Sequence, residues 1–321
     1  MISPRIAILA ATALALWFQA PVRAEEKPAP NAQQKKLTLE EQKQLAETKT
    51  AFDAALNLYA QGKYVEAEKG WRTALAVRER VLGAEHPDTL DCRMNLAVAM
   101  DDQGKHAEAE REHRAVLAIQ ERVFGAEHPD SSTSRMNLAN ALKAQGKNAE
   151  AEKEHRTVLA VRERVLGAEH PETLMSRMNL ANALRAQGKN VEAEKEHRAV
   201  LAIRERVLGA EHPETLVSRN NLANALQVQD RHAEAEKEHR VVLAIRERVR
   251  GPEHPDVFVS CYNLALSLAA QRKFPEALAF MRRAEKGWTK VLGPEHQDSK
   301  KAKQYGERIE AELKKQQAGG K

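Results

Sequence analysis

The sequence predicts an all-α solenoid made of consecutive helix-turn-helix repeats. A glycine recurs every 42 residues, and the thirteen-residue segment RERVLGAEHPETL at 162–174 returns unchanged at 204–216. Within each period, apolar residues are spaced by three, four and seven positions, as in amphipathic helices. A period between about 20 and 50 residues indicates stacked units that bury their apolar faces against one another. The recurring glycines are Gly83, Gly125, Gly167, Gly209, Gly251 and Gly293.

The first 24 residues have the composition of a bacterial signal peptide. Arg5 precedes a run of thirteen apolar or small residues at 6–18, and Val-Arg-Ala at 22–24 has small side chains at the positions that a signal peptidase reads. The run is shorter than the roughly 20 residues that a spanning helix needs. We therefore expect an exported bacterial protein, periplasmic or extracellular, that begins at Glu25 and has no membrane span after cleavage.

The next segments are a linker and the repeat array. Residues 25–37 are polar and contain proline, so we expect them to be disordered. A Thr38-x-x-Glu41 capping box is expected to start the first helix, ahead of the position near 48 that the period gives. The array is expected to span 38–292 with six units. Their first helices are expected near 48, 90, 132, 174, 216 and 258.

The fourth unit shows how each joint and turn are built. Gly167 is expected to adopt the left-handed conformation that closes a helix, and Pro171 to occupy the first turn of the next. Glu172 is favourable at the positive end of that helix dipole. Gln187-Gly188-Lys189 is the predicted turn within the unit.

A final helix is expected to close the array at its C-terminal end. Tyr305, Ile309 and Leu313 share one face of the segment 293–316, and lysines occupy much of the rest. Repeat arrays need such a polar cap on the terminal unit. Residues 317–321 are expected to form a disordered tail.

The repeats resemble the tetratricopeptide repeat, and in particular its kinesin-light-chain type. In the second to fifth units, a Leu-Ala-x-x-Leu (or Met) segment precedes the turn and an Ala-x-x-x-His segment follows it. The period of 42 also fits HEAT and armadillo repeats, but these two segments favour the tetratricopeptide alternative. The first pair of segments comprises Leu96, Ala97, Met100, Gly104, Ala109 and His113, and the second comprises Leu138, Ala139, Leu142, Gly146, Ala151 and His155. The kinesin-light-chain features are His170-Pro171, Asn179-Leu180-Ala181, Gln187-Gly188-Lys189 and Glu192-Ala193-Glu194.

This resemblance covers residues 48 to about 300 and implies a right-handed superhelix. It implies a concave groove, lined by the first helices, that binds a peptide or protein segment. It does not imply a motor role, because the leader predicts export and the sequence has no heptad coiled coil. The chain departs from the family in one column, where the family usually has tyrosine; here that column holds His113, His155, His197 and His239.

The twelve histidines all follow the repeat, which favours packing over chemistry. We expect the column just described to be at least partly packed between helices. A catalytic or metal site needs different residue types that converge, and no HExxH, CxxC or Cys-His-Asp pattern is present. The sequence thus predicts neither an enzyme nor a cofactor. The repeated Glu-Ala-Glu carboxylates are expected on solvated helix faces without shifted pKa values.

Charge and cysteine content exclude two further classes. Without the leader, 49 basic residues (51 less Arg5 and Arg23) balance 46 acidic ones, and the two signs interleave along the helices. That pattern is typical of solvated faces and argues against nucleic-acid binding. Cys92 and Cys261 lie four periods apart, which places them at least ~30 Å from each other and rules out a disulfide between them.

The candidate binding residues come from the groove positions that the resemblance implies. Amides offer a donor and an acceptor to an extended peptide backbone, and two cations in the middle units could select an acidic residue. The first row could instead bridge neighbouring helices. The first row is Asn95, Asn137, Asn179, Asn221 and Asn263; the second is Val98, Asn140, Asn182, Asn224 and Leu266; the third is Asp101, Lys143, Arg185, Gln227 and Ala269.

The predicted function is a non-enzymatic scaffold that binds an extended protein segment. Because Asn140, Asn182 and Asn224 occur only in the middle units, we place the site there. The alternative is a structural protein of the cell envelope whose near-identical repeats associate with each other. The first function predicts a monomer, and the second predicts self-association.

Overall fold

The computed structural model describes residues 37–319, and every regular element in that range is an α-helix. Twelve helices form six consecutive pairs, and a thirteenth follows them. The predicted signal peptide, and the linker except for its last residue, lie outside the described residues. The helices are α1 (Leu39–Ala60), α2 (Tyr64–Leu82), α3 (Pro87–Asp102), α4 (His106–Val123), α5 (Pro129–Ala144), α6 (Asn148–Leu166), α7 (Pro171–Ala186), α8 (Asn190–Leu208), α9 (Pro213–Gln227), α10 (His232–Arg250), α11 (Pro255–Ala270), α12 (Phe274–Leu292) and α13 (Gln297–Gly319).

The predicted all-α repeat architecture is confirmed, with small shifts at the helix ends. The Thr38 capping box starts α1 as expected. The other first helices begin about three residues before the predicted points, because the joint proline is itself the first helical residue. The last helix, α13, continues to Gly319, beyond the predicted end at 316. Gln316, Gln317 and Ala318 favour helix, and nothing before Gly319 breaks it.

The glycine at each joint has a different conformation from the one predicted. Gly167 closes α6 with φ 90° and ψ 158°, so its φ is positive but its ψ is extended. Gly209 and Gly251 repeat this geometry. The left-handed helical region, which asparagine can also enter, has ψ near +50°, whereas the region observed here is essentially restricted to glycine. The joint therefore needs glycine more strictly than a left-handed cap would.

The joint histidines are the N-caps of the following helices. His170 lies just before α7, and its Nδ1 atom accepts a hydrogen bond from the Glu172 amide at 3.3 Å. An N-cap acceptor satisfies one of the amides that the first helical turn leaves without a partner. Proline follows directly at the first helical position in five of the six joints. The other capping histidines are His86, His128, His212, His254 and His296.

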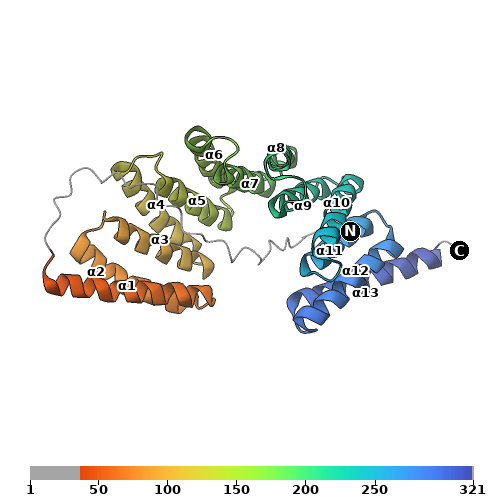
Figure 1. Cartoon of the computed structure of the whole chain (residues 1–321), viewed down its shortest axis with the longest axis horizontal. Helices are drawn as coiled ribbons and strands as arrows, with labels where there is room; N and C mark the ends of the chain where they lie inside the picture. The colour runs from red at the N-terminus through yellow and green to blue at the C-terminus, as the bar shows by residue number, and fades with distance from the viewer. Residues whose placement is uncertain (1–36, 320–321) are drawn as a thin grey trace.

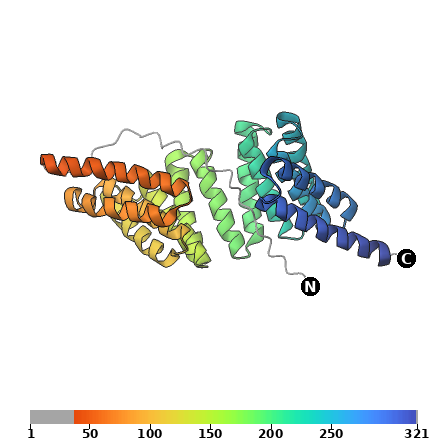
Figure 2. The same ribbon diagram turned by 90° about the horizontal axis from the view of Figure 1, so that it is seen from below.

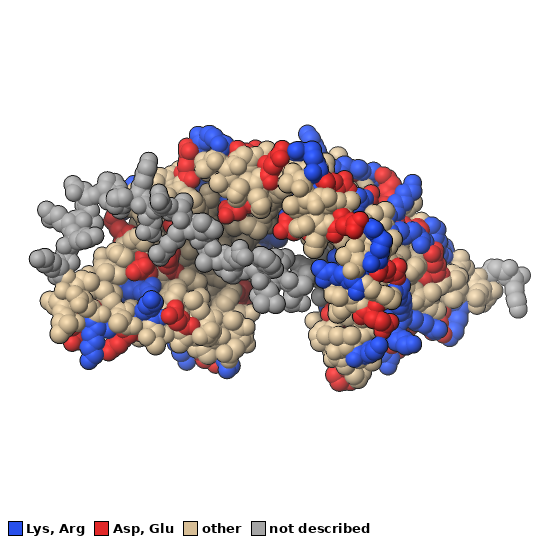
Figure 3. Space-filling model, in the orientation of Figure 1, with Lys and Arg blue, Asp and Glu red and all other residues tan. Residues whose placement is uncertain are grey.

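The helix pairs follow an arch in which the odd-numbered helices form the inner side (Figure 1). Figure 2 shows that successive pairs lie side by side along the long axis. In the space-filling view the arch is hollowed on the side of the odd-numbered helices (Figure 3). The first helix of each unit therefore lines the concave side, as the resemblance implied. The right-handed sense of the superhelix stays a prediction.

A column of buried side chains runs along the second helices. His113, His155, His197 and His239 are at most 3% exposed, which confirms that these histidines pack between helices. Trp71 and Met281 fill the same position in the first and last units and are also buried. Because burial disfavours the charged form, it lowers the pKa of each of these histidines to about 4.

Both cysteines are free, as predicted, and both are buried. The Cys92 thiol donates to the Trp71 carbonyl at 3.2 Å. Burial raises the pKa of Cys92 and of Cys261 to about 11. Each therefore remains a thiol and acts as a small core residue.

Candidate functional site

A cluster of polar contacts joins each unit to the next. Glu152 on α6 accepts hydrogen bonds from Gln187 at 2.5 Å and from Lys189 at 2.7 Å, both in the turn of the following unit. Arg156, one turn further along α6, donates to the same carboxylate at 2.6 Å. We call this arrangement the inter-repeat clamp. The corresponding carboxylates are Glu68, Glu110, Glu194 and Glu236.

The clamp corrects the expectation that all Glu-Ala-Glu carboxylates are solvated with unshifted pKa values. Glu152 is only 8% exposed, whereas Glu150 is exposed as predicted. Desolvation alone would raise the pKa of Glu152, but the hydrogen bonds from Lys189, Arg156 and Gln187 outweigh it and hold the pKa at about 2. The sequence pattern gives no difference between the first and second glutamates of the Glu-Ala-Glu segment. They differ only once the units stack and the following unit covers the second glutamate.

Three arginines on the inner helices each form two ion pairs, although the buried Nε atoms of Arg177 and Arg219 have no hydrogen-bond partner among the described residues. Arg177 on α7 pairs with Glu163 of the preceding unit and with Glu196 of its own unit. Arg135 and Arg219 repeat this pattern. These three inner helices, α5, α7 and α9, are thereby held to the second helices on both sides.

The first asparagine row is half-buried on the inner helices, and it is only partly satisfied. The Asn95 amide donates to the Asp91 carbonyl of its own helix at 2.8 Å. The Asn179 amide contacts the Met136 sulfur of the preceding unit at 3.3 Å. Within the described residues, the side chains of Asn137, Asn221 and Asn263 have no hydrogen bond. The bridging interpretation is therefore supported at Asn179 but not along the row.

The second asparagine row lies one turn further along the same helix faces. Asn140 is exposed, and Asn182 and Asn224 are half-buried. In the part of the chain that the structure describes, none of the three amide side chains has a hydrogen-bond partner. Donors and acceptors on three consecutive inner helices are therefore open to a ligand.

Two cations without ion pairs stand beside this row. Lys143 is at the end of α5 and Arg185 is at the same position of α7. Burial lowers the pKa of Lys143, and the like charge of Arg185 lowers it further. Burial also lowers the pKa of Arg185. Lys143 is nevertheless exposed to water, whereas Arg185 is half-buried. Neither cation has an ion-pair partner among residues 37–319.

Sequence reasoning missed an apolar row on the inner helices. Met175, Val217 and Val259 occupy one position of α7, α9 and α11 and are 41%, 40% and 38% exposed. That position lies four residues before the first asparagine row, on the same helix face. In the second and third units it holds Asp91 and Thr133. A comparison of the repeats could have identified this row, since the residue type at this position also varies between units.

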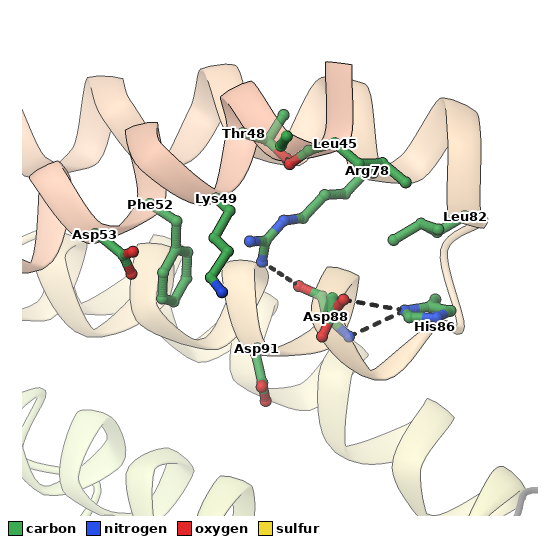
Figure 4. A pocket seen from close by; sticks show the side chains of 11 residues that line it. Leu45, Thr48, Lys49, Phe52, Asp53, Arg78, Leu82, His86, Asp88 and Asp91 are labelled. Atoms are coloured by element: carbon green, nitrogen blue, oxygen red, sulfur yellow. Dashed lines mark hydrogen bonds and ion pairs between the residues drawn. The ribbon is translucent and has the colours of Figure 1, made fainter. Parts of the chain in front are cut away.

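A cavity of about 600 Å³ lies at the N-terminal end of the inner face, between α1, α2 and the start of α3 (Figure 4). Lys49, Phe52 and Asp53 of α1 and Arg78 of α2 line it, together with His86 at the joint. The Arg78 guanidinium lies 4.7 Å from the centre of the Phe52 ring. Sequence reasoning did not single out this cavity.

Other kinds of site find no support in the described part of the chain. No group of three or more histidine, cysteine or carboxylate side chains in residues 37–319 could hold a metal ion. Among the described helices, none is long and apolar enough to cross a membrane.

The arch and its lining define a helical-repeat protein with an open concave surface. The chain belongs to the tetratricopeptide repeat family, whose profile matches residues 44–122, 102–153, 130–194, 174–248 and 218–290.

The repeats are of the kinesin-light-chain-like type. Two solved structures of a Podospora anserina protein, described as having kinesin light chain nearly identical TPR-like repeats, are 31% and 32% identical to this chain. Their TM-scores are 0.60 and 0.59, and each match covers 64% of this chain and 97% or 98% of the other. BtubC from P. vanneervenii shares the fold at 19% identity and a TM-score of 0.56, over 80% of this chain and 94% of its own. The comparison with curated proteins gave no match.

Proposed function

We propose that this tetratricopeptide repeat protein is a non-enzymatic scaffold that binds an extended protein segment along its concave surface. The proposal places an acidic residue of that segment over Lys143 and Arg185. The observation that carries it is the pair of partly buried cations without ion-pair partners in a chain where other inner-face arginines have two. Lys143 is exposed and Arg185 is half-buried, and partial desolvation disfavours the charged form of both, so an acidic ligand would gain from neutralising them.

The open amides support the same placement. Asn140, Asn182 and Asn224 can donate to and accept from a peptide backbone whatever its side chains are. Such a ladder gives affinity without sequence preference, and the two cations supply selectivity.

Replacing Asn140, Asn182 and Asn224 with alanine should weaken partner binding and leave folding intact. Each amide contact is worth ~0.5–1.5 kcal/mol, so the triple variant should bind roughly tenfold more weakly or worse. Exposed substitutions shift stability within about 0.5 kcal/mol, and urea unfolding should confirm this. Titration calorimetry with a partner recovered from the source cell's envelope fraction measures the binding. A triple variant that unfolds while its folded fraction binds normally would show that the row is structural.

Reversing Lys143 and Arg185 to glutamate should slow association with an acidic partner at low salt. Electrostatic complementarity mainly raises the association rate, and salt screens it. Stopped-flow association at ~20 mM and ~500 mM salt should show a large difference between wild type and variant only at the lower concentration. An unchanged rate at low salt would remove the acidic partner from the proposal.

Self-association of the repeats is the competing function, and solution size decides between them. A receptor for a separate partner should remain a monomer as its concentration increases. Light scattering that showed growth over a hundredfold concentration range would favour the structural alternative.

We also propose that the protein is exported and acts in the periplasm or outside a bacterial cell. The basis is the leader pattern of residues 1–24. N-terminal sequencing of the native protein should find Glu25 first, and an intact Met1 would contradict the proposal.

A further inference from the structure

We infer that the cavity between α1, α2 and α3 is a second anion subsite, which takes a single carboxylate attached to an apolar group. It lies at the N-terminal end of the inner face, apart from the central pair Lys143 and Arg185. The inference rests on Arg78, on Lys49 and on the apolar surface beside them.

Arg78 has fewer partners than its counterparts in other units. It is 8% exposed, and its Nη1 atom donates to the Asp88 carbonyl at 2.7 Å. Arg162 makes the same contact to the Glu172 carbonyl but adds a hydrogen bond to Ser176 at 2.9 Å and an ion pair with the Glu172 carboxylate at 3.1 Å. Arg204 likewise binds Ser218 and Glu214.

Two sequence changes in the second unit explain the difference. Cys92 stands where those units have serine, and its thiol is directed to the Trp71 carbonyl instead. Asp88 replaces glutamate and is one methylene shorter, and its carboxylate lies 3.9 Å from His86. Among residues 37–319, the Asp88 carbonyl is the one acceptor of an Arg78 hydrogen bond, so other N–H groups of this guanidinium have no partner there. An incompletely satisfied guanidinium in a cavity is a ready donor to a carboxylate.

Lys49 supplies the second donor. It occupies the groove slot that holds Asp91, Thr133, Met175, Val217 and Val259 in the following units, so it is the one cation of that row. In residues 37–319 it has no ion-pair partner. Figure 4 shows its ammonium group directed into the same space as the Arg78 guanidinium. The two donors therefore converge from different helices.

The remaining lining selects the kind of anion. Leu82 lies near His86 at one end of the cavity, and the Phe52 ring lies beside Asp53 at the other, next to the Arg78 guanidinium. Together with Leu45 they give apolar surface that can contact an alkyl or aromatic group, and Asp53 adds negative charge. A polyanion such as nucleic acid or a multiply charged phosphate would be repelled there, whereas one carboxylate can reach the two donors.

In one respect the inference rests on the proposed function, because it assigns the carboxylate to a segment that lies in the groove. Lys49 and Lys143 lie two units apart, which corresponds to a separation of ~20 Å along the arch. Their positions within the inner helix differ by ten residues, which adds ~15 Å along the helix axis. An extended chain covers the resulting ~25 Å with about eight residues. A segment that fills both subsites would carry its carboxylates at about that spacing. The carboxylate could be an acidic side chain or a free chain end.

Small probes test the subsite without the partner. Three are compared by ligand-observed NMR: N-acetyl-phenylalanine, its primary amide, and N-acetyl-aspartyl-phenylalanine amide, which carries its carboxylate on a side chain. The free acid should bind, and the first amide should bind at least about tenfold more weakly. Binding of the third probe would indicate an acidic side chain, and binding of the free acid alone would indicate a chain end. Equal binding of acid and primary amide overturns the inference.

Variants of the full chain locate the binding. Lys49→Gln and Arg78→Gln should each weaken binding of the acid probe by about tenfold. The matched control is Lys43→Gln, an exposed lysine of the same helix outside the cavity, and it should bind as wild type does. Equal affinity in Lys49→Gln and Lys43→Gln overturns the inference. If Arg78→Gln does not fold, the wild type is titrated with the acid probe and its backbone amide NMR signals are followed. Shifts of the Phe52 and Asp88 signals would support the inference, and unchanged signals would overturn it.

One further variant separates this subsite from the proposed function. Lys143→Gln with Arg185→Gln should keep full binding of the acid probe, since neither residue lines the cavity. If that double variant loses the protein partner but binds the probe, both proposals stand. If Lys49→Gln binds the probe normally while the double variant loses the partner, only the second subsite is wrong.

Discussion

Acidification from pH 7.5 to pH 5 should lower the stability of this protein by several kilocalories per mole. The pKa values of His113, His155, His197 and His239 are held near 4 by burial, against about 6.5 in the unfolded chain. Between pH 6.5 and pH 4, these histidines are therefore protonated in the unfolded state but mostly neutral in the folded state. This contribution is complete above pH 6.5 and is lost as the pH falls toward 4, at about 2 kcal/mol per histidine at pH 5. Thermal melts at the two pH values measure it.

The last unit suggests the control. Met281 fills the column position that the four histidines fill elsewhere, so methionine is compatible with the packing. A variant with all four histidines changed to methionine should lose most of the stability difference between pH 7.5 and pH 5. If the variant and the wild type lose stability equally, the column is not the origin of the acid sensitivity.

Glu152→Ala should destabilise the protein by about 2 kcal/mol, whereas Glu150→Ala should cost less than about 0.5 kcal/mol. The two residues flank one alanine, so they form a matched pair. Loss of Glu152 removes the acceptor of Gln187, Lys189 and Arg156 together. The two cations are about half-exposed and recover water, which keeps the cost below that of a fully buried pair. Urea unfolding at pH 7.5 compares the midpoints.

The pH dependence of this effect distinguishes the clamp from the histidine column. Because hydrogen bonds hold the pKa of Glu152 near 2 against 4.5, its stabilising contribution is complete above pH 4.5 and lost only below it. The cost of Glu152→Ala should therefore be the same at pH 7.5 and pH 5. A cost that disappears at pH 5, or equal costs for Glu150→Ala and Glu152→Ala, would show that the clamp does not hold the units together.

The period of the sequence was sufficient to place nearly every helix, because each unit carries its own start and stop residues. Proline fixes the first turn and glycine ends the second helix, and both are local effects. The packed histidine column was also predictable, since Trp71 and Met281 mark it in the end units. Local rules thus account for the fold.

Features that depend on contacts between units were not predictable from one unit. Glu150 and Glu152 are alike in sequence, and only the arrival of Gln187 and Lys189 from the next unit buries one of them. Histidine is not a usual N-cap residue, so the role of His170 needed the position of its Nδ1 atom. Arg78 lacks a serine partner because Cys92 stands fourteen residues further on, where the units of Arg162 and Arg204 have serine. The buried carboxylate of Glu152 was missed because its partners arrive only through stacking, whereas the cap at His170 is a local contact that needed the side-chain geometry.

The clamp has a consequence for how this chain can change over generations. Glu110, Glu152 and Glu194 each bind a glutamine and a cation of the following unit. Both the carboxylates and their partners recur at the 42-residue period. Recombination within the gene that gained or lost one whole period would recreate the same junction on both sides. The length of the arch, and so the length of segment that it can accommodate, is thereby free to vary while every junction stays intact. The end units, with Trp71 and Trp288 in their cores, are the parts that such exchange must spare.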